Sequence, residues 1–300
     1  MTVLTAGETM GLLDPAEDGP LRLGMPMTLR FAGAESNYAI ALARLGVPVR
    51  WVSRVGPDPF GDLILSTLGR EGVDTRFACR GQTRTGLFVK WREGGRSRVA
   101  YYRSGSAACD LCPEDAPDEA LEDIRLVHLT GITMAISPSG CTFVLDLARR
   151  AKERGLTVVF DPNFRPALPD TPEAATARQR PLLEHVDWYL CGLDEGNALW
   201  GTANETELAR AVPVASVIRL GARGALVAGD LVPPPREVEV VDEVGAGDAF
   251  AAGFAYGLLQ GWEPRACVAA ANLIAGHALA GTGDWETLPR LDDVRNELVR

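Results

Sequence analysis

The sequence contains no apolar run that approaches the roughly 20 residues needed to cross a bilayer, so no membrane-spanning helix is expected. Positive charge is scarce, because 30 Lys and Arg residues stand against 40 Asp and Glu residues, for a formal net charge of −10. Nucleic acids and anionic membrane surfaces would therefore meet like charge, and neither is expected as a partner. The first residues lack the basic and long apolar segments of a secretory signal peptide, which favours a cytoplasmic protein. An anionic substrate would need local cations.

Metal-ligand spacings are also missing. The three histidines, His128, His185 and His277, show no metal-binding pattern. Among six cysteines only Cys109 and Cys112 form a C-x-x-C pair, and a structural zinc site needs four ligands. A metal or redox site and a pair of unlinked loop thiols both fit this spacing, and the second is favoured.

Short apolar runs alternate with longer helical patterns along the chain. Strands are expected at 2–8, 49–56, 125–132, 156–163, 187–193 and 215–221, and helices at 36–46 and 142–154. Ser36 or Asn37 is expected to cap the first helix, and Gly46 to end it. This alternation predicts one α/β domain over residues 1–300, with a mostly parallel central sheet and helices on both faces.

One region departs from that alternation. Two strand-like runs flank Gly94 and Gly95, which is a hairpin pattern, and residues 20–37 also read as extended. We expect a small β-sheet lid, built from about 12–32 and 80–105 and inserted in the main domain. Ligands of open α/β sheets bind beyond the carboxyl ends of the strands, and a flap beside that edge is suited to cover them.

The segment DEVGAGDAFAAGF, Asp242–Phe254, places glycines beside an acid at the start of an apolar helix. A strand is expected before it at 236–242, and the helix after it should be buried. The free N–H groups of a helix N-terminus, reached through Gly245–Gly247, can cradle a phosphate or an oxyanion. Asp248 inside this cradle would repel phosphate but suits a general base that accepts the proton of an attacking hydroxyl. The alternative is that Asp248 only caps a core helix.

Several segments, in order, resemble one family over nearly the whole chain. DEVGAGDAFAAGF resembles the C-terminal signature of the ribokinase/PfkB carbohydrate kinases, and FAGAESNYAIALARLG followed by RVGPDPFGDLI resembles their N-terminal signature. GVDT, FDPNFR and RLGARGA also fit. Within the family, GAESN, AYYRSGSA, LTGITMAIS and the TGD near the C-terminus are most similar to the kinases of 2-keto-3-deoxygluconate. The resemblance implies a ribokinase-like fold, with ATP and Mg²⁺ as cofactors.

The resemblance also implies roles for individual residues. It implies catalysis by Asp248 with the cradle of Gly245, Ala246 and Gly247. It implies sugar contacts at Gly33, Ala34, Glu35, Ser36, Asn37, Phe88, Tyr102, Arg103, Arg165, Asp248 and Asp284. It implies ATP contacts at Asn163, Arg165, Gly221, Arg223, Gly224, Gly245 and Gly247, and an indirect role for Glu195 in organising the metal.

Three positions depart from the family pattern. Phe88 stands where the subgroup commonly has a substrate-facing tyrosine. The N-x-x-E motif keeps Glu195 but has Gly192 in place of asparagine, and Glu243 replaces a signature threonine. None of the three changes the expected base, Asp248.

Two arginines favour an acidic sugar on chemical grounds. Arg103 follows an expected lid strand and Arg165 follows the end of another strand, so both are directed at one crevice in an acidic protein. Arginine binds carboxylates through two parallel hydrogen bonds. Alternatively, Arg103 is a solvated strand residue and Arg165 binds only phosphate.

The sequence thus predicts ATP-dependent phosphorylation of a sugar acid, most specifically 2-keto-3-deoxygluconate at its 6-position. A kinase of neutral sugars such as fructose or ribose, and a non-catalytic sugar-binding protein, stay open as alternatives. An exposed β flap has an apolar outer face to bury, so a homo-oligomer formed through the lid is also expected.

Overall fold

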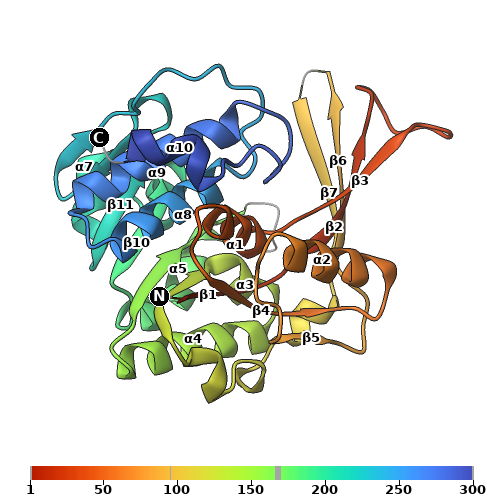
Figure 1. Ribbon diagram of the computed structural model, residues 1–300, viewed down its shortest axis with the longest axis horizontal. Coiled ribbons are helices and arrows are strands. Elements are labelled where there is room, and N and C mark those ends of the chain that lie inside the picture. The colour runs from red at the N-terminus through yellow and green to blue at the C-terminus, as the bar shows by residue number, and fades with distance from the viewer. Residues whose placement is uncertain (1, 95, 166–169, 299–300) are drawn as a thin grey trace.

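A nine-stranded sheet forms the centre of the computed structural model, which describes residues 2–94, 96–165 and 170–298 (Figure 1). The strand order is β13-β12-β11-β10-β9-β8-β1-β4-β5. Every neighbouring pair from β5 to β11 is parallel, whereas β12 and β13 form an antiparallel edge. The strands are β1 (Thr2–Ala6), β4 (Val49–Val55), β5 (Ala78–Arg80), β8 (Ile124–Thr130), β9 (Thr157–Asp161), β10 (Trp188–Gly192), β11 (Ala215–Arg219), β12 (Ala225–Val227) and β13 (Asp230–Val232). The expected mostly parallel sheet is confirmed.

Helices cover both faces of this sheet, as successive residues of β1 illustrate. Val3 packs into a core cluster with Tyr38 and Phe254, whereas Leu4 packs into a second cluster with Phe143 on the opposite face. The helices are α1 (Ala34–Arg44), α2 (Pro59–Arg70), α3 (Gly131–Ile136), α4 (Pro138–Glu153), α5 (Pro172–Leu183), α6 (Leu193–Trp200), α7 (Glu205–Ala211), α8 (Ala246–Leu259), α9 (Pro264–Leu279) and α10 (Leu291–Leu298). No helix in the described ranges is long and apolar enough to cross a membrane.

A second sheet, with strand order β3-β2-β6-β7, projects from the body at the right of Figure 1. It contains β2 (Met10–Pro15), β3 (Met27–Ala32), β6 (Leu87–Glu93) and β7 (Arg96–Tyr102). We call this sheet the lid. The expected hairpin is present as β6 and β7, and Gly95 of its turn lies outside the described residues.

Contacts with two loops of the body fix the lid in place. Phe31 of β3 stacks on Trp285 at 5.2 Å between ring centroids, and the indole Nε1 of Trp285 donates to the carbonyl of Phe31. Lys90 of β6 forms an ion pair of 2.8 Å with Asp242, in the loop that leads into α8. The lid therefore lies over the carboxyl edge of the main sheet.

Two local predictions were wrong. Residues 236–242 form no strand, because their alternating apolar residues find no partner strand and Val240 and Val241 are exposed. The first helix begins at Ala34, so its cap is Gly33 and neither Ser36 nor Asn37. Ser36 instead donates its hydroxyl hydrogen to the carbonyl of Gly33, at 3.0 Å. Gly46 does end this helix, with φ of 78°.

Candidate active site

A cleft of about 470 Å³ lies between the lid and the carboxyl edge of the main sheet. Thirteen residues expected from the sequence line it: Gly33, Ala34, Glu35, Asn37, Phe88, Arg103, Asn163, Arg165, Glu195, Gly245, Gly247, Asp248 and Asp284. Ser36, Tyr102, Ala246, Gly221, Arg223 and Gly224 do not line it.

The N-terminus of α8 opens directly into this cleft. Its cap, Gly245, has φ of 77°, and a Cβ there would overlap the carbonyl oxygen of Asp284, so only glycine fits. Within the described residues, the N–H groups of Gly247 and Asp248 have no hydrogen-bond acceptor in the protein. Unpartnered amides at the positive end of a helix form an anion site.

The carboxylate of Asp248 lies beside these amides and is buried. Its Oδ2 accepts a hydrogen bond of 2.8 Å from Nδ2 of Asn37 in α1. Burial raises the pKa of Asp248 to about 6, against the opposing effects of Asn37 and the positive charge of Arg165. The group is therefore ionised at neutral pH, yet basic enough to take a proton from a neighbouring hydroxyl.

Two further carboxyl groups share the cleft. Burial raises the pKa of Glu35 to about 7, and Oε1 of Glu35 accepts hydrogen bonds from the hydroxyls of Thr130 (2.6 Å) and Thr133 (2.9 Å). Burial likewise raises the pKa of Asp284 to about 7, although the charge of Lys90 opposes this. Both groups can exchange protons with a ligand near neutral pH.

On the lid side, Tyr101 and not Tyr102 faces the cleft. Side chains alternate along β7, and Tyr101 pairs with Phe88, its ring centroid 5.7 Å away, whereas Tyr102 is 55% exposed. Arg103 follows on the cleft side, but it is not a solvated residue. Its guanidinium is buried and paired with Glu8, a residue that the sequence analysis did not single out.

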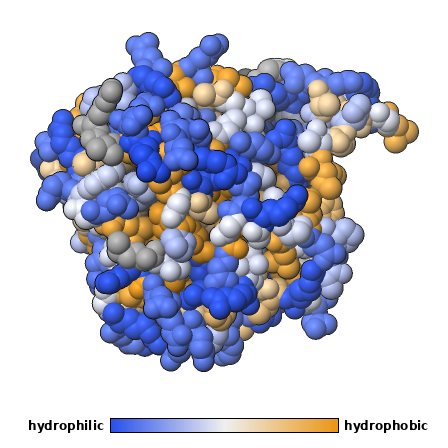
Figure 2. Space-filling model, in the orientation of Figure 1, coloured by the Kyte–Doolittle hydropathy of each residue, from blue (hydrophilic) through white to orange (hydrophobic). Residues whose placement is uncertain are grey.

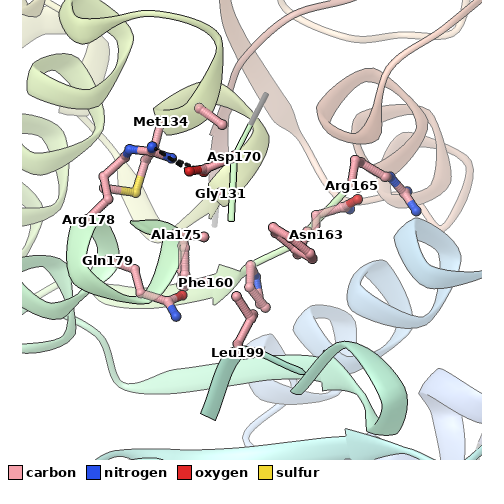
Figure 3. Close-up of a pocket in the computed structure, with 13 residues that line it drawn as sticks. Gly131, Met134, Phe160, Asn163, Arg165, Asp170, Ala175, Arg178, Gln179 and Leu199 are labelled. Atoms are coloured by element: carbon pink, nitrogen blue, oxygen red, sulfur yellow. Dashed lines mark hydrogen bonds and ion pairs between the residues drawn. The ribbon is translucent and has the colours of Figure 1, made fainter. Parts of the chain in front are cut away.

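Arg165 supplies the other expected cation. It follows Asn163, whose φ of 43° turns the chain sharply after β9, and Arg165 is exposed where it lines the cleft. In the close-up of a neighbouring pocket its side chain points away from the paired Asp170 and Arg178 (Figure 3). That pocket holds only about 20 Å³, room for a water molecule but not for a ligand.

A group of three charged residues, Arg219, Asp161 and Glu195, lies beside the cradle. Arg219, at the end of β11, forms ion pairs with Asp161 (2.6 Å) and Glu195 (3.5 Å), and the carboxylates raise its pKa against the effect of its burial. Burial raises the pKa of Glu195, and the nearby charge of Asp161 adds to this. The guanidinium of Arg219 lies beside Gly247, because a Cβ there would be 3.7 Å from Nη1. Of these three residues, only Glu195 was expected from the sequence.

These carboxylates are not arranged as a metal centre. Oxygens of Glu195 accept the N–H groups of Gly192 (3.0 Å) and Phe164, so they are already engaged. Across the described part of the chain, no group of three or more His, Cys, Asp or Glu residues could hold a metal ion.

The remaining expected nucleotide residues lie in the turn after β11. Gly221 and Gly224 have φ of 60° and 92°, which makes this turn glycine-dependent. Arg223 is exposed and pairs with Glu205 at 2.8 Å. The turn follows Arg219, which itself lines the cleft.

Known proteins share the sequence pattern and the fold of this chain. The profile of the pfkB family carbohydrate kinases matches residues 2–290. The chain is 34% identical to 2-dehydro-3-deoxygluconokinase of Bacillus subtilis, over 96% of this chain and 93% of that protein. The crystal structure of 2-dehydro-3-deoxygluconokinase of Thermotoga maritima superimposes with a TM-score of 0.90 at 26% identity, covering all of both chains. An uncharacterised sugar kinase of Pyrococcus horikoshii, solved in complex with ATP, has a TM-score of 0.87 at 25% identity, covering 99% of each chain.

Proposed function

The chain belongs to the pfkB family of carbohydrate kinases, and from this premise we propose that it transfers the γ-phosphoryl group of ATP to a sugar acid, 2-keto-3-deoxygluconate in particular. The acceptor is the 6-hydroxyl group, and Asp248 is the general base. The observation that carries this proposal is the ionisable Asp248 carboxylate beside unpartnered helix amides, in a cleft that also presents Arg103 and Arg165.

Two neighbouring groups in the cleft serve the two parts of the reaction, which are proton removal and stabilisation of the phosphoryl charge. Asp248 accepts the hydroxyl proton as that oxygen approaches the phosphorus, and Asn37 holds the carboxylate in place. The N–H groups of Gly247 and Asp248 bind the negative charge that spreads over the transferring phosphoryl oxygens. A fixed cradle pays no reorganisation cost at this moment, which is why helix amides suit the task.

The acidic nature of the sugar rests on the two arginines and on the relatives. Arg103 lies at the lid end of the cleft, and Arg165 adds a second cation. A neutral hexose has no carboxylate for Arg165 or for the part of the Arg103 guanidinium that Glu8 leaves free, whereas a 2-keto acid supplies one. Phe88 offers the sugar an apolar contact and no hydroxyl.

The nucleotide is proposed to lie along the glycines of the two turns, Gly221–Gly224 and Gly245–Gly247, with Asn163 and Arg165 beside its phosphates. Mg²⁺ bound to those phosphates neutralises part of their charge. Glu195 keeps the loop at Phe164 and the start of α6 together through its backbone hydrogen bonds, and so holds the phosphate side of the cleft.

A coupled assay of ADP release over a panel of keto-sugar acids and neutral sugars tests this function. We expect the highest kcat/KM with 2-keto-3-deoxygluconate, and a drop of about tenfold or more for sugar acids alone in Arg103→Ala, the size expected for a lost charged hydrogen bond. Preference for fructose or ribose would make the protein a neutral-sugar kinase. Tight sugar binding without transfer to any acceptor would make it a sugar-binding protein.

We also propose that the lid joins two copies of the chain. Apolar side chains are exposed on β3 and in the loop before it, namely Leu21, Leu23, Met27 and Leu29. Figure 2 shows hydrophobic surface at the end of the projection. Light scattering after gel filtration tests this: Leu29→Glu should shift the mass to that of a monomer, whereas Leu231→Glu, at a comparably exposed position on β13, should not. A monomeric wild type would disprove the proposal.

A further inference from the structure

Glu8 lies at the point where the main sheet passes into the lid. It follows β1, is 2% exposed, and lines the cleft. Its Oε2 accepts a hydrogen bond of 2.8 Å from Nε of Arg103, a residue 95 positions further along the chain, and forms an ion pair with Nη2 of the same guanidinium. Its Oε1 accepts the hydroxyl hydrogen of Ser106. Each oxygen of this carboxylate therefore has a partner at the end of β7.

The surroundings of Glu8 are shaped to fit this carboxylate. A Cβ at position 86 would lie 2.7 Å from Oε1 of Glu8, so Gly86 leaves the space that the carboxylate occupies. The N–H of Ser106 also donates to the carbonyl of Arg103 (2.9 Å), which fixes the turn that carries both partners.

The way in which Glu8 binds the guanidinium leaves part of it free. Arginine presents five N–H groups in a rigid planar fork, along a side edge (Nε and Nη2) and an end edge (Nη1 and Nη2). Glu8 occupies the side edge. In the described part of the chain, Nη1 has no hydrogen-bond partner in the protein, and Arg103 lines the cleft. The end edge is thus available for a second carboxylate.

We infer that Glu8 is a positioning residue for sugar binding: it fixes Arg103 by the side edge, so that the end edge meets the carboxylate of the sugar acid. This inference rests on the proposed function. Glu8 contacts no reacting group, so it acts through Arg103 on affinity. If Glu8 instead competed with the ligand for the guanidinium, its neutralisation would strengthen sugar binding. Positioning predicts a higher KM for the sugar acid in Glu8→Gln, and competition predicts a lower one.

The test compares Glu8→Gln with Glu71→Gln in the full-length chain. Glu71 forms a partly buried pair with Arg44, with Nε 2.9 Å from Oε2, and does not line the cleft. We expect Glu8→Gln to raise KM for 2-keto-3-deoxygluconate about tenfold or more, with kcat and the KM for ATP within about threefold of wild type. Ser106→Ala should raise the same KM by a smaller factor, and Ser106→Thr, which keeps the hydroxyl, should restore it. Glu71→Gln should leave all three constants unchanged.

A second readout needs no substrate. The Nε–H resonance of Arg103, identified by its loss in Arg103→Lys, should exchange slowly with water in the ligand-free wild type and rapidly in Glu8→Gln. An unchanged or lowered KM for the sugar acid in Glu8→Gln overturns the inference, as does an equal rise in Glu71→Gln. If the wild type prefers a neutral sugar, the proposed function fails, because such a sugar has no carboxylate for the end edge, and the Nε–H exchange alone then decides whether Glu8 fixes Arg103. If no sugar is phosphorylated, the inference is overturned when the Nε–H of Arg103 exchanges equally fast in the wild type and in Glu8→Gln.

Discussion

Replacing Asn37 by alanine should move the acid limb of the pH–activity profile upward. Asn37 donates the hydrogen bond of 2.8 Å that stabilises the ionised form of Asp248. Hydrogen bonds to charged groups contribute about 1.5–3 kcal/mol, and one pKa unit corresponds to about 1.4 kcal/mol. Loss of the bond should therefore raise the pKa of Asp248 from about 6 by roughly one to two units, with the lower figure applying where water replaces the amide.

The assay is kcat/KM for the sugar between pH 5 and 9, at saturating ATP. A general base must be ionised, so activity falls as pH drops through its pKa, with a midpoint near pH 6 in the wild type. In Asn37→Ala this midpoint should lie near pH 7 to 8. A weakened sugar contact lowers the whole profile and leaves the midpoint unchanged, so the two effects separate.

Asn272→Ala is the matched control. Asn272 is also a buried helical asparagine, but its Nδ2 donates to the carbonyl of Val232 (2.9 Å), away from Asp248. The midpoint of the pH profile of Asn272→Ala should equal that of the wild type. If the midpoint of Asn37→Ala also stays near pH 6, the acid limb does not report Asp248 and the reasoning is refuted.

Three further predictions concern folding and the cradle. Gly245→Ala should abolish turnover and lower the free energy of unfolding by more than about 1 kcal/mol in urea titrations, because the helix cap has a positive φ and no room for a Cβ. Unimpaired turnover in this variant would mean that the cradle is not rigid. Arg219→Ala should cost about 3–5 kcal/mol in the same titration, because Asp161 and Glu195 lose their buried partner, and a loss below 1 kcal/mol would show that water replaces it. Burial favours the protonated form of Glu35 in the folded state, so the contribution of Glu35 to stability is complete below about pH 4.5 and declines as pH rises to about 7. Thermal unfolding of Glu35→Gln should lack that decline, and the same pH dependence in the wild type and the variant would contradict the raised pKa of Glu35.

The regular part of the fold was predictable because its signals are local. Apolar runs marked the parallel strands, and residues such as Val3 and Leu4 are buried on both faces of the sheet. The segment 236–242 has the same local pattern, yet it is no strand, because a strand also needs a partner that sequence cannot locate. The same limit explains Tyr101: only the pairing of β7 with β6 determines which tyrosine faces the cleft.

The site itself was partly visible in the sequence. Asp248 and its glycines are contiguous, so one segment indicated their chemistry. Glu8 and Asp161 were not singled out because their partners, Arg103 and Arg219, lie 95 and 58 positions away. An isolated acid in a sequence carries no sign of the arginine that it will meet, and only the packing of β1, β9 and β11 against their neighbours brings these charges together.

The most direct test of the account is the turnover and nucleotide affinity of Asp248→Asn, measured together. The amide has the shape of the carboxylate but cannot accept the hydroxyl proton, while the cradle amides keep their positions. The account predicts ATP affinity within about threefold of wild type and a kcat lower by roughly 10²- to 10⁴-fold, the contribution of a positioned base. A kcat close to that of the wild type would contradict it, because proton removal would then depend on another group.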